Sequence, residues 1–218
     1  MTTLEQSKTF SVPILFIVFN RPEVTARVFE MIRKIKPEKL FIAADGPRDT
    51  INNEYENTLL VRKIVENIDW PCLINKRYSE KNLGCKIAVS SAITWFFDNV
   101  EEGIILEDDC LPNLSFFYFC RDLLERYKNT DRVKVISGTN FLSTHDKAKY
   151  DYYFSNFPQI WGWATWKRAW AEYDLQMRDY PRFKRDNKMR IIFKDKKIQK
   201  YYLKSYERLY QNLSLIHI

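Results

Sequence analysis

The sequence is poor in the residues that build metal clusters, flexible tails and common nucleotide-binding loops. It has two histidines and four cysteines (Cys72, Cys85, Cys110 and Cys120) without a C-x-x-C pair. We therefore predict no zinc site and expect four reduced thiols, most of them in the core. Only five residues are glycine and 16% are aromatic, which argues against a disordered chain. The motifs G-x-G-x-x-G and G-x-x-x-x-G-K-[ST] are both missing, which argues against a dinucleotide-binding domain and a P-loop nucleotide-binding domain.

Long apolar runs are also missing. The first one, residues 12–19, follows Glu5 and Lys8, and no small-residue cleavage site comes after it. No run approaches the roughly 20 apolar residues that span a membrane. We therefore expect a cytoplasmic protein, and its 218 residues suffice for a single domain over 1–218.

Positive charge is concentrated near the end of the chain. The net charge is +7, yet residues 178–210 alone hold twelve basic and four acidic residues. In this segment four basic residues recur at every fourth position, opposite an apolar and aromatic stripe: Lys196, Lys200, Lys204 and Arg208 against Ile198, Tyr202, Tyr206 and Tyr210. A helix docked on the domain with its charges in solvent explains this pattern. Peripheral contact with an anionic inner membrane is the alternative, and no nucleic-acid signature accompanies the charge.

Apolar runs alternate with helical patterns over the first 140 residues. The runs predict strands, and the segments between them carry apolar residues at helical spacing, such as Leu60, Ile64 and Ile68. This alternation predicts an α/β fold with a mainly parallel central sheet flanked by helices. The predicted strands are 12–19, 39–44, 72–75, 103–106 and 133–138.

Polar residues follow three of these strands, where ligands of parallel sheets bind. They are Asn20-Arg21, Asp45 with Arg48, and the triplet Glu107-Asp108-Asp109. Three adjacent carboxylates repel one another, and a divalent cation bound with a diphosphate would relieve that repulsion. The alternative is an acidic loop that caps the next helix.

Three further motifs each allow two interpretations. Asp45 can accept hydrogen bonds from a base or ribose, or make an Asp-Gly-Pro turn. Lys86, in the helix start Asn82–Lys86, can face phosphates or solvent. The tryptophans of Trp161–Trp170 can stack on a sugar, with Gly162 allowing close approach, or fill the core.

In combination these motifs resemble a known family. The segments 13–22, 44–48, 82–86, 106–113 and 161–166 are similar to those of bacterial GT-A fold nucleotide-diphospho-sugar transferases, some of which carry a haemolytic-protein label. The resemblance covers roughly residues 12–175. It implies a nucleotide-binding half (12–140), an aromatic donor and acceptor side (141–175) and a basic helical appendage (176–218).

The resemblance also implies roles for individual residues. Asn20, Arg21 and Asp45 would line the nucleotide pocket, and Lys86 would approach the diphosphate or ribose. Glu107 and Asp108 would contact the nucleotide-sugar, and Asp109 would ligate Mn²⁺ or Mg²⁺. The segment Trp161, Gly162 and Trp163 would shape the donor-sugar and acceptor side.

The implied activity is inverting, metal-dependent transfer of a sugar from a nucleotide-diphospho-sugar to an acceptor hydroxyl. A UDP-sugar is the favoured donor, a glycan or lipid-linked molecule the acceptor, and bacterial surface polysaccharide or glycan synthesis the setting. The family's Thr-Trp-Asp-like motif, which would supply the general base, has no counterpart before Ile218. We therefore expect a C-terminally truncated chain without an assigned catalytic base. A fragment that binds donor but turns over slowly, and a membrane-binding module, are the alternatives.

Overall fold

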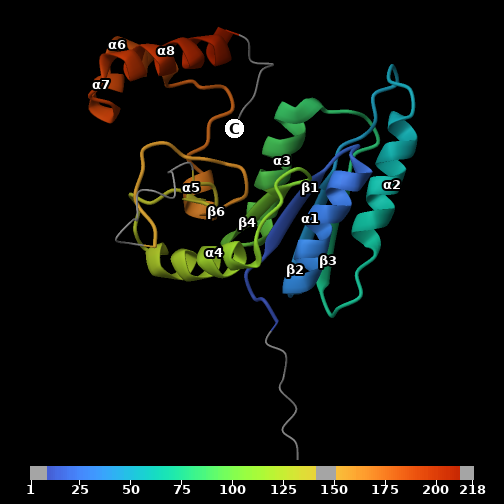
Figure 1. The fold of residues 1–218 in the computed structure, drawn as a ribbon. Coiled ribbons are helices and arrows are strands. Elements are labelled where there is room, and N and C mark those ends of the chain that lie inside the picture. Colours follow the sequence, from blue (N-terminus) through green and yellow to red (C-terminus); the bar gives the residue numbers. More distant parts are fainter. Residues whose placement is uncertain (1–8, 141–150, 212–218) are drawn as a thin grey trace, which may run out of the picture. The chain divides into compact units, whose positions relative to one another are not determined.

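The computed structural model describes residues 9–140 and 151–211. The chain divides into two compact units. The first comprises Met1–Lys147 with Pro158–Ala171 and contains the sheet; the second comprises Ala148–Phe157 with Glu172–Ile218 and contains the basic helices (Figure 1). The predicted single domain over 1–218 stays a prediction.

The first unit is built on a six-stranded sheet with the strand order β3-β2-β1-β4-β6-β5. The first four strands are parallel, whereas β6 runs antiparallel to both β4 and β5. The strands are β1 (Ile14–Val18), β2 (Lys39–Ala44), β3 (Leu73–Tyr78), β4 (Glu102–Glu107), β5 (Ile136–Ser137) and β6 (Trp163–Trp166). The predicted α/β class with a mainly parallel sheet flanked by helices is confirmed.

Helices cover both faces of the sheet. Consecutive side chains of a strand point to opposite faces, so an unbroken apolar run such as β1 needs cover on each side. Phe16 of β1 packs on Phe29 of α1, and Phe41 of β2 packs on Trp95 of α3. The helices of this unit are α1 (Pro22–Ile35), α2 (Glu54–Glu66), α3 (Gly84–Asn99), α4 (Leu114–Tyr127) and α5 (Lys167–Trp170).

The buried face of α2 differs from the predicted one. Leu60 and Ile64 were expected inside, but Leu60 is 48% exposed, and Ile68 lies beyond the end of the helix. The residues that face the protein are Glu54, Thr58, Val61 and Val65. They lie one residue away from the predicted stripe, which is about 100° of helix rotation. The hydrogen bonds of the buried Glu54 carboxylate to Arg48 and Asn20 explain this orientation.

The strands at the far edge also differ from expectation. The strand predicted over 133–138 is reduced to Ile136–Ser137, and part of the tryptophan cluster forms the inserted strand β6. Trp163 and Trp166 are buried there, so the core interpretation holds for them. The expectation that most cysteines fill the core is wrong, since only Cys120 is buried.

The second unit contains α6 (Tyr180–Arg185), α7 (Met189–Ile192) and α8 (Lys196–Gln211). The aromatic side of α8 packs inside this unit: Tyr202 stacks on Phe193 with ring centroids 5.1 Å apart, and Tyr210 lies 5.1 Å from Tyr180. The predicted basic helical segment is therefore confirmed. Within the described part of the chain, no helix combines the length and apolarity needed to cross a membrane.

Candidate functional site

The carboxyl ends of the parallel strands gather the predicted polar residues at one edge of the sheet. In the parallel register Val18 lies beside Ala44 and Ile17 beside Glu107. The residues that follow β1, β2 and β4 therefore emerge next to one another. This edge is the candidate site.

Two members of the acidic triplet, Asp108 and Asp109, are held by one arginine. Asp108 is 2% exposed and accepts a hydrogen bond from the Phe19 amide at 3.3 Å. The Arg21 guanidinium donates to both aspartates, to Oδ1 of Asp108 and to Oδ2 of Asp109 at 2.9 Å. Arg21 and Asp109 are each about half exposed, so this ion-pair network opens to solvent. A guanidinium thus lies where the sequence predicts a need for positive charge.

Burial opposes charge on the two inner carboxyl groups. It raises the pKa of Glu107, and the neighbouring Asp109 and Asp108 carboxylates raise it further. Burial also raises the pKa of Asp108, although the Arg21 charge and hydrogen bond act in the opposite direction. Added positive charge at this edge would lower the cost of keeping all three carboxylates ionised.

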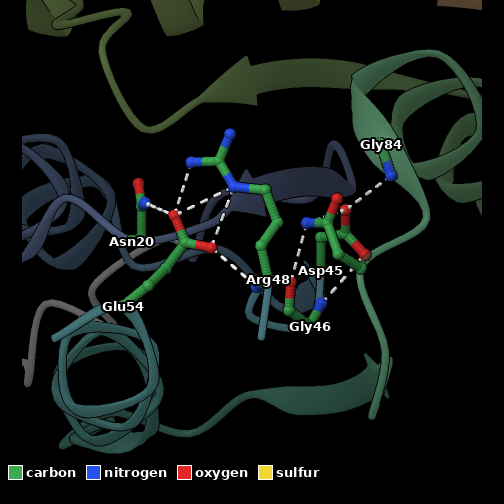
Figure 2. A network of polar contacts seen from close by, with 7 residues as sticks. Asn20, Asp45, Gly46, Arg48, Glu54 and Gly84 are labelled. Atoms are coloured by element: carbon green, nitrogen blue, oxygen red, sulfur yellow. Dashed lines mark hydrogen bonds and ion pairs between the residues drawn. The ribbon is translucent and has the colours of Figure 1, made fainter. Parts of the chain in front are cut away.

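A second network, centred on Glu54 of α2, joins Asn20, which follows β1, to the loop after β2 (Figure 2). The Glu54 carboxylate is 1% exposed and accepts hydrogen bonds from the Arg48 amide at 2.6 Å and from Asn20 Nδ2 at 2.7 Å. The Arg48 guanidinium donates through Nε and, at 2.5 Å, through a terminal nitrogen. The hydrogen bonds from Arg48 lower the pKa of Glu54 to about 2.

Glu54 is not among the site residues predicted from the sequence. A signal was present, because Glu54 shares a helical stripe with Thr58, Val61 and Val65. A carboxylate on such a face needs a buried partner. Arg48, six residues earlier, was noted at the sheet edge without a role.

Asp45 is engaged by the start of α3 (Figure 2). Its Oδ1 accepts hydrogen bonds from the Gly46 and Leu83 amides, both at 2.9 Å. Its Oδ2 accepts from the Gly84 amide at 3.2 Å and from Asn82 Nδ2 at 3.1 Å. Two carboxylate oxygens offer about four acceptor positions, which these donors occupy. This geometry gives Asp45 a structural role at the helix start, and its contact with a nucleotide stays a prediction.

Lys86 lies in the first turn of α3, half-buried. Near this end of α3 a small pocket is lined by Asp45 and by short side chains of β2 and α3, among them Ala44, Ala88 and Ser91. Short side chains leave the space between helix and sheet unfilled. Lys86 and Asp45 are thus both carried by segments that border this hollow.

The aromatic segment reaches the same edge through β6. Ile105 pairs with Trp163 in antiparallel register, which carries Trp161 and Gly162 toward the end of β4. Gly162 has a φ of 73°, a left-handed conformation that favours glycine. Trp161 is 64% exposed and Trp163 only 5%. Trp161 therefore offers an accessible ring, while Trp163 packs in the core.

The described residues leave the predicted metal role of Asp109 untested. No group of three His, Cys, Asp or Glu residues within 9–140 and 151–211 is arranged to hold a metal ion. The two histidines, His145 and His217, and the end of the chain, where the family motif has no counterpart, lie outside the described residues. The metal role of Asp109 stays a prediction.

No family model matches the sequence, and no curated protein matches it. Among solved structures, the chain is similar to 4-diphosphocytidyl-2C-methyl-D-erythritol synthase from Anaerococcus prevotii. The superposition has a TM-score of 0.42 and 13% identity, and it covers 81% of this chain and 84% of the other.

Proposed function

We propose that this chain binds a nucleotide-diphospho-sugar at the carboxyl edge of its sheet and serves sugar transfer to an acceptor hydroxyl. The supporting observation is the convergence of Arg21, Arg48 and the Glu107–Asp109 triplet from distant parts of the sequence. Exposed guanidinium groups beside a carboxylate cluster suit a diphosphate that arrives with a cation.

The arginines would hold the donor's phosphates. The side chains of Arg21 and Arg48 are about half exposed, so each retains hydrogen-bonding capacity toward a ligand. A guanidinium carries five N–H donors and can contact phosphate oxygens in pairs. Glu54 keeps Arg48 beside Asn20, and Lys86 would add a further positive charge. A UDP-sugar is the favoured donor.

One protein carboxylate would suffice for a divalent cation that enters with the diphosphate. Mg²⁺ and Mn²⁺ are commonly held by one or two carboxylates together with substrate phosphates and water. Asp109 is half exposed, and the Arg21 cation already lies against it. We propose Asp109 as the protein ligand of Mn²⁺ or Mg²⁺. When bound, the cation would stabilise negative charge on the departing nucleotide diphosphate.

The acceptor side would be formed by Trp161 and Gly162. The exposed indole offers a flat apolar surface for a sugar ring, and the glycine lets a ligand approach the backbone. The proposed acceptor is a glycan or a lipid-linked molecule, and the proposed setting is bacterial surface polysaccharide or glycan synthesis. We assign no general base.

A thermal-shift screen tests the proposal. Nucleotide-sugars with different bases are added with and without Mn²⁺, and ligand at 100 times its Kd stabilises by about 2.7 kcal/mol. For a chain of this size that corresponds to a Tm rise of about 5–10 °C. A rise that needs both donor and Mn²⁺ supports the proposal. No rise with any nucleotide-sugar refutes it.

A further inference from the structure

One side of α8 concentrates positive charge, and Glu207, the acidic residue on the same arc, is paired with Lys184 of α6. Five basic residues lie within about 120° of the helix circumference at 3.6 residues per turn, and all are exposed. We call this set the basic face: Lys196, Lys197, Lys200, Lys204 and Arg208.

The basic face differs from a group of paired basic residues in the same unit. Lys184 pairs with Glu207 at 2.5 Å, and Arg182 and Arg185 both pair with Asp186. Among residues 9–140 and 151–211, the side chains of the basic face form no ion pair or hydrogen bond. Its positive charge is therefore uncompensated by the part of the protein that the structure describes.

Packing on the opposite side fixes which way the basic face points. Tyr202 lies between Phe157 and Phe193, at centroid distances of 5.4 and 5.1 Å. Tyr180 packs on Tyr206 and Tyr210 of the same side, with ring centroids 6.5 and 5.1 Å apart. Rotating α8 to bury its lysines would break these contacts, so the basic face remains directed outward from its own unit.

We propose that the basic face docks the protein on an anionic lipid surface. The face spans about 18 Å along a straight helix, which suits a flat partner. Tyr201, 67% exposed, borders it and carries the amphipathic ring that favours a membrane interface. Lysine heads act as point charges that need no defined geometry in the partner. This inference is independent of the proposed function.

Co-sedimentation of the full chain with vesicles tests the inference. The vesicles contain phosphatidylcholine with or without phosphatidylglycerol. Each basic residue near an anionic surface strengthens binding about fivefold. The double variant Lys200→Gln/Lys204→Gln should therefore bind phosphatidylglycerol vesicles about 25-fold more weakly. The control, Lys63→Gln/Lys81→Gln, removes the same charge from exposed sites of the first unit and should bind like the parent.

Three outcomes decide the matter. Lipid docking is supported if only the α8 variant loses binding to phosphatidylglycerol vesicles and if about 0.5 M salt releases the parent protein from them. Equal binding by both variants overturns it. Duplex DNA that binds more tightly than the vesicles, with the same dependence on Lys200 and Lys204, assigns the face to nucleic acid instead. Tyr201→Ser distinguishes lipid docking from DNA binding, since it should weaken binding to vesicles and leave binding to DNA unchanged.

Discussion

Glu54 offers a sharp test of how the candidate site is held together. The substitution Glu54→Gln keeps the shape of the side chain and removes its charge. Arg48 would then lose a charged acceptor, to which its backbone amide donates a hydrogen bond at 2.6 Å and its guanidinium one at 2.5 Å. Hydrogen bonds to charged groups contribute about 1.5–3 kcal/mol. We expect a loss of this size in the free energy of unfolding, or about 3–12 °C in Tm.

The pH dependence provides a second readout with a definite sign. The pKa of Glu54 is lowered from 4.5 to about 2 in the folded protein, chiefly by hydrogen bonds from Arg48. A lowered carboxyl pKa stabilises the fold at pH values above the unfolded pKa. That stabilisation fades as the pH falls from about 4.5 to about 2. The difference in stability between parent and Glu54→Gln should shrink over the same interval.

Glu56→Gln is the matched control. Glu56 lies in the same first turn of α2, so it experiences the same helix dipole, but it is exposed. Chemical denaturation at several pH values compares the two variants with the parent. Equal effects of both substitutions, or a Glu54→Gln deficit that persists unchanged below pH 3, would refute the importance of the buried network.

Two further substitutions test other parts of the first unit. Asp45→Ala should lower the free energy of unfolding by about 1.5–3 kcal/mol and weaken nucleotide-sugar binding, because it frees the amides at the start of α3. The control Asp49→Ala, in the exposed loop that follows, should change neither quantity. Equal effects of the two substitutions in denaturation and calorimetry would argue against a structural role for Asp45. Gly103→Ala should destabilise by about 1–3 kcal/mol, since a methyl group there collides with the Phe96 ring, and an unchanged melting curve would contradict that packing.

The sequence predicted the parallel half of the fold well, because local signals specify it. The strand predicted at 39–44 matches β2, since an apolar run there ends at an Asp-Gly-Pro turn. The role of β6 was not predictable in this way. This strand depends on the pairing of Trp163 with Ile105, which is far away in the sequence. A short apolar run does not indicate which strand it will pair with.

The candidate site shows the same division. Parallel topology alone places Arg21 and Asp109 at one edge, so their proximity could be expected. The contact between Arg48 and Glu54 could not be expected from the topology, because it depends on the conformation of the loop between the two residues. Asp45 was ambiguous between turn and ligand, and only the positions of the Leu83 and Gly84 amides reveal its structural contacts.

Calorimetric titration of Asp109→Asn tests the central claim most directly. The parent and variant are titrated with the nucleotide-sugar that stabilises the parent, with and without Mn²⁺, and Asp98→Asn on α3 serves as an exposed control. We predict Mn²⁺-dependent binding by the parent and by Asp98→Asn. In Asp109→Asn it should weaken by at least about 10–100-fold, the loss seen even for outer-shell partners of metal sites, with no change in Tm. Equal affinity of Asp109→Asn and parent in the presence of Mn²⁺ would contradict the claim.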